Sequence, residues 1–339
     1  MKFIRLLLFP FAIIYAITMS IRNFMFDVGL LKSTSFNKPI IAVGNLSVGG
    51  TGKTPQIEYL IRLLKKHNLG VLSRGYGRET KGFVLADASK KATDIGDEPL
   101  QFFRKFTDIT VAVDEDRVHG IEQLNKVNVL LLDDAFQHRK VNAGFYVVLT
   151  KYNDLFSNDF VLPAGNLRER RVGVKRANAV VITKCPSNIT VAEQQEIEKL
   201  IRRYFEGPIF FSTIKYADVL LNNKHQEIKT MALSNYEVLL VTGIANPAPM
   251  LAYLTGLNCT YTHFNFSDHH QFTKKEIAGL QQQFDALKNK NKMILTTEKD
   301  FVRLSDTLAN VYYLAIETSF IEGQQEFDKM IVDYVNSGL

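Results

Sequence analysis

The sequence predicts an α/β protein in which a P-loop-type parallel sheet carries helices on both faces, followed by a second, smaller α/β domain. A glycine-rich loop separates an apolar run at 40–43 from a helical pattern that begins near Pro55. Short apolar runs then alternate with helical patterns, which is typical of strands buried on both faces. A second alternating series follows the polar stretch Asn222–Lys229. We therefore expect a nucleotide-binding domain at 31–221 and a second domain at 222–339 that closes a cleft.

The expected elements follow from these patterns in chain order. Continuous apolar runs predict strands at Val71–Ser73, Thr110–Val113, Val129–Leu132, Phe145–Leu149, Ala179–Thr183, Val238–Thr242, Thr260–Phe264, Met293–Thr297 and Val311–Ile316. Apolar residues at helical spacing, together with capping residues, predict helices at Pro55–Lys66, Pro99–Phe106, Val118–Leu124 and Gln324–Tyr334, and further helices that begin after Thr190, Pro247 and Thr273.

The bulk composition is that of an ordinary globular protein. The chain has 339 residues and a formal net charge of +6, with a pI near 9.1. This small positive surplus fits an anionic partner such as a nucleotide or a phospholipid headgroup, and it also serves solubility. Cys185 and Cys259 cannot form a disulfide framework and lack metal-ligand spacing, so we expect a reducing compartment.

An uncharged apolar run extends from Leu6 to Ile21, with basic residues on both sides. As a helix it would span roughly 24 Å, less than the roughly 30 Å hydrocarbon core of a bilayer. A secretory signal would need a small-residue cleavage site, and a buried core helix is the plain alternative. We favour a helix at 1–30 that dips into or barely crosses one membrane face, with the body of the protein on the cytoplasmic side.

The loop between the first strand and the first helix has the features of a phosphate-binding loop. Glycines let backbone N–H groups converge on an anion, a lysine adds a mobile positive charge, and a threonine hydroxyl can bind Mg²⁺. A strict match would have glycine where this chain has Ser47, and a chance glycine-rich turn is the alternative. The residues expected to bind a nucleoside triphosphate are Gly49, Gly50, Thr51, Gly52, Lys53 and Thr54.

Two pairs of carboxylates are candidates for metal binding and proton transfer. Asp133 and Asp134 end a buried strand, so we expect them beside the phosphate-binding loop, where one of them would bind Mg²⁺. A turn capped by aspartate is the alternative. Asp97 and Glu98 precede a proline, which is typical of a helix cap. The same pair would also suit a base for an attacking hydroxyl and a further metal ligand.

Basic loops and a pair of histidines complete the candidates. Arg74 and Arg78 directly follow a strand, and a similar basic segment spans 162–171. Such arginines suit phosphate recognition, with solvated loop charge as the alternative. In the second domain, the segments 268–270 and 297–300 also follow strands. The two histidines of 268–270 lack a third ligand at metal spacing, which favours acid–base or orienting work over zinc binding.

Taken together, seven ordered motifs resemble the tetraacyldisaccharide 4'-kinase family of lipid A biosynthesis over nearly the whole chain. They lie at 44–55, 73–77, 96–99, 133–138, 163–169, 268–270 and 297–300. The resemblance implies ATP-dependent phosphorylation of the 4'-hydroxyl of a tetraacyl glucosamine disaccharide 1-phosphate, which forms lipid IVA. It also implies Mg²⁺, a membrane lipid as substrate and a place at the cytoplasmic face of the inner membrane. We expect no nucleic acid partner and no obligate protein partner.

The resemblance also assigns roles to single residues. Lys53 and Thr54 would serve the phosphates and Mg²⁺. Asp133 and Asp134 would be the Walker B acids, with Glu98 near the metal. Asp97 would be the catalytic base, with His269 as its partner, and Lys53 would also act in catalysis. The residues expected to bind the acceptor substrate are Arg74, Tyr76, Arg78, Arg117 and Arg168.

Two positions depart from the family pattern. Ala135 stands where the family usually has glycine, which leaves open which aspartate faces Mg²⁺, and Arg170 stands where it usually has proline. A second hypothesis is a membrane-docked P-loop ATPase switch that recruits a partner. That class usually has a lysine directly before the paired glycines of its loop, where this chain has Val48.

Overall fold

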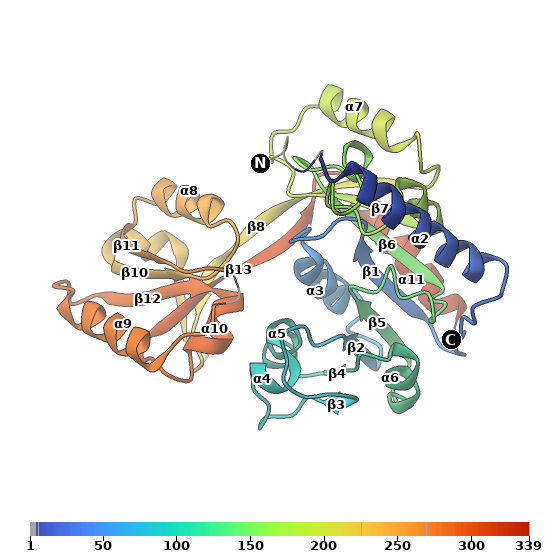
Figure 1. The fold of residues 1–339 in the computed structure, drawn as a ribbon. Coiled ribbons are helices and arrows are strands. Elements are labelled where there is room, and N and C mark those ends of the chain that lie inside the picture. The colour runs from blue at the N-terminus through green and yellow to red at the C-terminus, as the bar shows by residue number, and fades with distance from the viewer. Residues whose placement is uncertain (1–4, 6, 225, 269, 339) are drawn as a thin grey trace.

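The computed structural model describes residue 5 and residues 7–338, apart from positions 225 and 269. Figure 1 shows two lobes joined by long strands. The strands are β1 Ile40–Asn45, β2 Leu69–Ser73, β3 Val84–Leu85, β4 Ile109–Val113, β5 Val129–Asp133, β6 Phe145–Lys151, β7 Ala179–Thr183, β8 Ile209–Leu221, β9 Glu227–Lys229, β10 Glu237–Thr242, β11 Thr260–Asn265, β12 Lys292–Thr297 and β13 Val311–Phe320.

The helices cover both faces of the sheet. They are α2 Phe9–Asp27, α3 Lys53–Leu63, α4 Ala92–Ile95, α5 Asp97–Lys105, α6 Arg117–Gln123, α7 Val191–Ile201, α8 Ala248–Gly256, α9 Lys274–Ala286, α10 Glu298–Leu304 and α11 Gln324–Ser337, with 3₁₀ turns η1 Phe156–Asn158, η2 Arg171–Arg176 and η3 Thr230–Asn235. Thr190 and Thr273 form the predicted capping boxes, because each accepts from the backbone N–H three residues later.

One mixed sheet runs through both lobes in the order β11-β10-β12-β13-β8-β7-β6-β1-β5-β2-β4-β3. The first lobe contains β1–β7, and its central strands β4, β2, β5, β1, β6 and β7 are parallel. The second lobe contains β9–β12 with α8–α10, and β11, β10 and β12 are parallel. The predicted α/β fold class is confirmed. Because parallel strands end at one edge, the loops after β1, β2, β5 and β7 gather there.

Strands β8 and β13 connect the lobes. Residues 209–211 of β8 pair with β7 of the first lobe, and residues 212–221 pair with β13. After β13 the chain returns to the first lobe, where α11 buries Phe327, Ile331 and Val335 in the main core. Helix α11 therefore belongs to the first lobe by its packing, although the sequence pattern placed it with the second.

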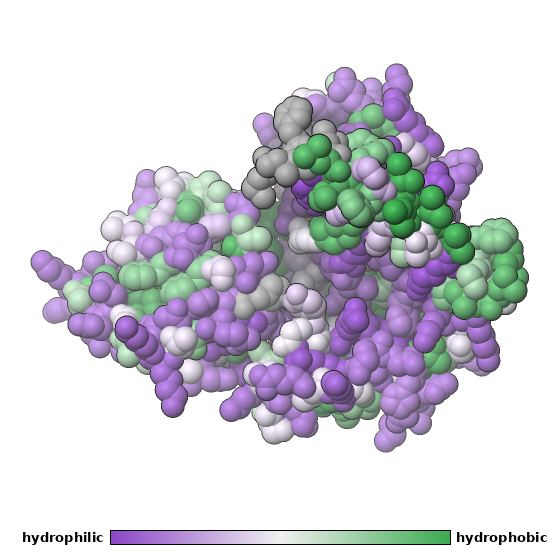
Figure 2. Space-filling model, in the orientation of Figure 1, coloured by the Kyte–Doolittle hydropathy of each residue, from purple (hydrophilic) through white to green (hydrophobic). Residues whose placement is uncertain are grey.

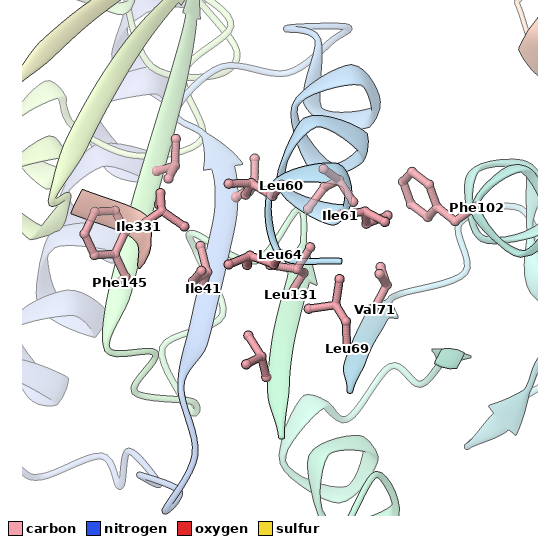
Figure 3. Close-up of a cluster of buried hydrophobic side chains, with 14 of the residues drawn as sticks. Ile41, Leu60, Ile61, Leu64, Leu69, Val71, Phe102, Leu131, Phe145 and Ile331 are labelled. Atoms are coloured by element: carbon pink, nitrogen blue, oxygen red, sulfur yellow. The ribbon is translucent and has the colours of Figure 1, made fainter. Parts of the chain in front are cut away.

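The main core of the first lobe lies between α3, α5, α11 and the sheet. Figure 3 shows Leu60 of α3 and Leu64, which caps it, on the side of Ile41 of β1 and Leu131 of β5, whereas Ile61 lies toward Phe102 of α5. These side chains repeat every three to four positions, so one stripe of α3 faces the sheet. This packing fixes the start of α3, and with it the glycine-rich loop, relative to the carboxyl ends of the strands.

Helix α2 lies on the surface of the first lobe, and only its Ala12 and Phe26 are buried. Its outer face is apolar (Figure 2), with exposed residues at helical spacing: Ile13, Ile14, Ile17, Ile21 and Phe24. Among the described residues, α2 is the helix that is long and apolar enough to span a membrane. The alternative of a buried core helix is therefore wrong.

Candidate functional site

The glycine-rich loop after β1 forms the predicted cradle. Gly49 and Gly52 have φ of +100° and +87°, a left-handed backbone that glycine adopts without strain, and Gly52 caps α3. Asn45 Nδ2 donates to Thr51 Oγ1 at 2.8 Å, and Thr183 Oγ1 donates to the Thr51 carbonyl at 2.7 Å. Thr51 is thus buried, and its hydrogen bonds hold the loop in place. The exposed Gly49 and Gly50 precede the N-terminus of α3, where backbone N–H groups can bind an anion.

Ser47, where a strict match would have glycine, pairs with the basic segment 162–171. Ser47 is 4% exposed and forms a backbone bridge with Leu167, and the Val48 N–H donates to the Asn166 carbonyl at 2.8 Å. The basic segment therefore fixes the first half of the loop, as Thr183 fixes the second half.

Asp134 lies between two cations. Its Oδ1 is 3.6 Å from Lys53 Nζ and accepts from Arg168 Nη1 at 2.9 Å. Burial opposes ionisation, but the charges of Lys53 and Arg168 outweigh it and hold the pKa of Asp134 below its ordinary value. Asp134 therefore stays ionised and keeps Lys53 at the mouth of the loop.

Asp133 has a different environment. Its Oδ2 accepts from Ser73 Oγ at 3.2 Å. Burial, followed by the neighbouring charge of Asp134, raises the pKa of Asp133 to about 6, and Glu98 contributes to the same rise. The two aspartates are thus distinct: Asp134 is paired with cations, whereas Asp133 faces a hydroxyl and lies within electrostatic reach of Glu98.

The turn after β5 does not need the glycine that the family usually has. The left-handed residue is Asp134, with φ of +49°, and aspartate tolerates this conformation. Ala135 is buried, and its N–H donates to the Val43 carbonyl at 3.3 Å. The methyl group of Ala135 is accommodated because the strained angle falls one residue earlier.

Asp97 is the first residue of α5, and the cap position is Gly96, with no side-chain cap hydrogen bond. The capping interpretation of Asp97 is therefore wrong. Asp97 is buried, and its carboxylate accepts from Arg303 of α10 at both oxygens. Glu98 Oε1 is 4.0 Å from Lys299 Nζ, which donates to Asp268 Oδ1 at 3.0 Å. Residues of the second lobe thus reach the start of α5.

The residues expected to bind the acceptor fall into two groups. Arg74 and Tyr76 are exposed on the loop after β2, and Arg168 lies beside Asp134. Arg78 donates to the Gly82 carbonyl at 2.8 Å and to Glu115. Arg117 is only 2% exposed. The first group is accessible to an acceptor, whereas Arg78 and Arg117 are turned toward partners within the protein.

Arg117 supports the loop that carries the aspartates. It donates to the carbonyls of Asp114 and Asp133, the latter at 3.3 Å. Burial lowers the pKa of its guanidinium to about 10, which leaves it positively charged at neutral pH. Arg117 therefore fixes the carboxyl end of β5 from beneath and does not line the surface.

His269 lies outside the described residues, so its pairing with Asp97 stays a prediction from the sequence. The next residue, His270, has ring Nε2 3.1 Å from Glu276 Oε1, and its carbonyl accepts from Arg303 Nη1. His138 is half-buried, and burial followed by the Arg117 charge lowers its pKa to about 4. A neutral, enclosed His138 agrees with a structural role.

Sequence reasoning missed Lys184 and Arg303. Lys184 Nζ donates to the Gly50 carbonyl at 2.8 Å, so it steadies the phosphate-binding loop from the end of β7. Its place after a buried parallel strand was a usable signal. Arg303 has no such signal, because it lies within a helix and its partner Asp97 is 206 positions away.

The oxygen donors at this edge suit a magnesium ion. Thr54 offers a hydroxyl, and Asp133 and Glu98 offer carboxylates, which are hard ligands of the kind that Mg²⁺ prefers. Within the described part of the chain, no group of three or more His, Cys, Asp or Glu side chains is arranged to hold a metal alone. Mg²⁺ is usually bound by one or two protein ligands together with substrate phosphates, and these few oxygen donors fit that mode of binding.

Comparisons with known proteins agree over the whole chain. The tetraacyldisaccharide-1-P 4'-kinase family matches residues 4–336. The tetraacyldisaccharide 4'-kinase of Flavobacterium johnsoniae is 50% identical over 346 residues, which cover 100% of this chain and 99% of that protein. The enzyme of the same name from Bacteroides thetaiotaomicron is 43% identical over 351 residues, with 97% and 92% covered. A crystal structure of LpxK from Aquifex aeolicus in complex with ATP has a TM-score of 0.79 and 31% identity, and covers 98% of this chain and 99% of that one.

Proposed function

Because this chain belongs to the tetraacyldisaccharide 4'-kinase family, we propose that it transfers the γ-phosphate of ATP to the 4'-hydroxyl of a tetraacyl glucosamine disaccharide 1-phosphate. The product is lipid IVA, an intermediate of lipid A biosynthesis. The observation that carries the proposal is the assembly of a phosphate-binding loop, the Lys53–Asp134 pair and the carboxylates of α5 in a chain that the family matches from end to end.

In the proposed reaction, Asp97 accepts the proton of the 4'-hydroxyl while the hydroxyl oxygen attacks the γ-phosphorus. The bond between that phosphorus and the bridging oxygen breaks, and ADP leaves with the electron pair. Phosphate transfer needs little more than alignment and charge neutralisation. Lys53 and the N–H groups at the start of α3 supply positive charge to the phosphates. For this step, Lys53 exchanges its contact with Asp134 for a contact with the nucleotide.

We further propose that Thr54 and Asp133 hold Mg²⁺, with Asp134 and Glu98 at its margin. The ion, when bound, neutralises charge on the β- and γ-phosphates. The hydrogen bond from Ser73 to Asp133 holds that carboxylate in one orientation. Arg168 compensates the charge of Asp134 when Lys53 turns to the phosphates.

Helix α2 offers a route for the acceptor. We propose that its apolar face enters the cytoplasmic side of the inner membrane. The opposite side of α2 is bound to the basic segment: Tyr15 Oη donates to the Arg168 carbonyl, and Asn23 Nδ2 donates to Glu169, both at 2.8 Å. Arg168 also donates to Asp134, so this one residue links α2 to the proposed phosphate site. A sugar headgroup held at the membrane surface would meet the site there.

The test is transfer of label from γ-labelled ATP to the disaccharide lipid in mixed micelles. A kinase places the label in the extracted lipid. A nucleotide switch releases it as free phosphate and leaves the lipid unlabelled, and that result would replace the proposal with the switch hypothesis.

A further inference from the structure

We propose that Arg303 is a positioning residue for the transfer reaction: from the second lobe, it holds the carboxylate of Asp97 in the place where it accepts the proton. This inference rests on the proposed function, because it takes Asp97 to be the base. It adds a residue that no sequence motif pointed to, and it gives the second lobe a defined part in catalysis.

The contact between Arg303 and Asp97 is a two-pronged ion pair. Arg303 Nε donates to Oδ1 at 2.7 Å, and Nη2 donates to Oδ2 at 2.6 Å. The Arg303 and Asp97 side chains are only 12% and 4% exposed. A planar guanidinium that engages both oxygens fixes the plane of a carboxylate as well as its position, and lysine lacks this geometry. The carboxylate cannot rotate without breaking both hydrogen bonds.

The remaining nitrogen of the guanidinium has a partner as well. Arg303 Nη1 donates to the carbonyl of His270, in the segment after β11. The His270 ring stacks on Phe266 with centroids 4.7 Å apart and contacts Glu276 at the start of α9. One side chain therefore joins α5 of the first lobe to α10 and the segment after β11 of the second lobe.

Helix α10 presents Arg303 from a fixed base. Its first turn is capped by Thr297, which accepts from the Asp300 N–H at 3.2 Å. Asp300 is 2% exposed and accepts from Thr297 Oγ1 at 2.7 Å and from the Gly243 N–H at 2.9 Å. These contacts tie α10 to the ends of β12 and β10. Arg303 follows one turn later, so its position relative to Asp97 is fixed by a helix that is itself held in place.

Asp97 and Arg303 belong to different lobes, so their contact exists only while α5 and α10 lie against each other (Figure 1). The same two helices make a second contact that does not involve Asp97. Arg104 donates to Asp306 Oδ2 at 3.0 Å and to the Val302 carbonyl at 3.2 Å. Arg104 therefore provides a matched control, because its loss weakens the helix contact without freeing the carboxylate.

The experiment compares Arg303→Met, Arg303→Lys and Arg104→Met in the full-length protein with ATP and the tetraacyldisaccharide 1-phosphate. We expect Arg303→Met to lower kcat on the order of 10²-fold, because a misplaced reacting group costs about that much. KM for ATP should change by less than about two-fold, since the phosphate-binding loop is intact. Arg303→Lys should recover part of kcat, and Arg104→Met should stay within about two-fold of the unmodified protein.

Several results would overturn the inference. One is a kcat for Arg303→Met close to that of the unmodified protein. Another is an equal loss in Arg104→Met, which would show that the helix contact alone matters. If thermal unfolding shows that Arg303→Met is not folded, Arg303→Lys and Arg303→Gln are compared instead. An equal kcat for those two variants would also overturn the inference. Asp97→Asn separates the proposals: an inactive Asp97→Asn with an active Arg303→Met refutes only the role of Arg303, whereas an active Asp97→Asn refutes the base itself.

Discussion

At the scale of single residues, the contact between Lys53 and Asp134 sets the state of the proposed phosphate site before a nucleotide binds. A lysine at the end of a glycine-rich loop needs freedom to follow bound phosphates, yet an unpaired ammonium in a half-buried site loses hydration. Asp134 resolves this conflict because its contact with Lys53 is long, at 3.6 Å, while its contact with Arg168 is short, at 2.9 Å. Lys53 can therefore move from Asp134 toward a bound phosphate, and Asp134 stays paired with Arg168.

Replacement of Lys53 by methionine should abolish most phosphate transfer. The variant keeps the length of the side chain but removes the charge that faces the transferred group, so we expect initial rates to fall on the order of 10²- to 10³-fold. The control is Lys38→Met, because Lys38 donates to the Leu124 carbonyl away from the glycine-rich loop. Rates of Lys53→Met within a few-fold of Lys38→Met would refute the role of Lys53.

In the candidate site, residues in local motifs could be predicted from the sequence, whereas contacts between distant segments could not. The phosphate-binding loop and the Asp133–Asp134 pair are local patterns at strand ends, and both lie at the predicted edge. For Asp97, the local sequence alone favours a helix cap over a base, since an acid before proline is a common cap. Its burial and its fork with Arg303 arise from the contact of two lobes, which no local pattern encodes. Arg117 was misjudged for a similar reason: a sequence shows its charge but not the backbone carbonyls that enclose it.

At the scale of elements, helices α3, α5 and α10 enclose a buried ionic cluster. Lys105 Nζ of α5 is 2.6 Å from Glu58 Oε2 of α3 and 2.8 Å from Glu298 Oε1 of α10. Gln101 donates to Glu58 at 2.8 Å, and Arg62 lies 3.6 Å from the same carboxylate. The two carboxylates raise the pKa of Lys105 although burial opposes this shift. Burial, followed by the charge of Glu58, raises the pKa of Glu298 to about 7.

This cluster predicts a pH dependence of stability. In the unfolded chain Glu298 loses its proton at its ordinary acidic pKa, whereas the folded protein retains the proton up to about pH 7. The folded state therefore binds more protons in this window, and rising pH favours unfolding. The free energy of unfolding, measured by urea titration at pH 5 and pH 7.5, should fall more in the unmodified protein than in Glu298→Gln. A larger fall in Glu298→Gln would contradict the assignment.

Helix α2 predicts a separable membrane contact. Ile17 and Ile21 are 54% and 55% exposed on its apolar face, so changing both to aspartate should reduce binding to anionic vesicles while unfolding temperature stays nearly unchanged. Flotation with vesicles measures the bound fraction. The matched control is Val191→Asp with Met231→Asp, because these residues are 67% and 77% exposed elsewhere on the surface. Equal flotation of the two double variants would show that α2 does not hold the protein to the membrane.

The strands that are buried on both faces of the sheet are the ones that the sequence pattern predicts well. Strand β7 matches its predicted bounds, and β10 begins one residue earlier than predicted. Strand β8 was not predicted, because only its first part is buried in the sheet and the rest crosses between the lobes with partly exposed residues. Strand β13 likewise extends to Phe320, beyond its predicted end at Ile316, since the extra residues pair only with β8. The sequence pattern therefore predicts the buried part of a strand, and it misses residues that belong to the strand only by hydrogen bonding.

At the scale of the whole molecule, one mixed sheet continues from the first lobe into the second through β8 and β13. The space-filling view shows a hollow between the lobes (Figure 2). The first lobe supplies the glycine-rich loop and the apolar helix α2, and the second lobe supplies Arg303, which donates to Asp97. Transfer to the acceptor should therefore need both lobes, whereas the glycine-rich loop belongs to the first lobe alone.

The most direct test of this account is the intact mass of the lipid after incubation of the purified protein with ATP, Mg²⁺ and tetraacyldisaccharide 1-phosphate. We predict a gain of one phosphate group, with fragmentation placing it on the 4'-position of the distal sugar, and a much smaller yield of that product with Lys53→Met in the same time. A lipid of unchanged mass, while ATP is still consumed to free phosphate, would contradict the central claim that this protein is a lipid kinase.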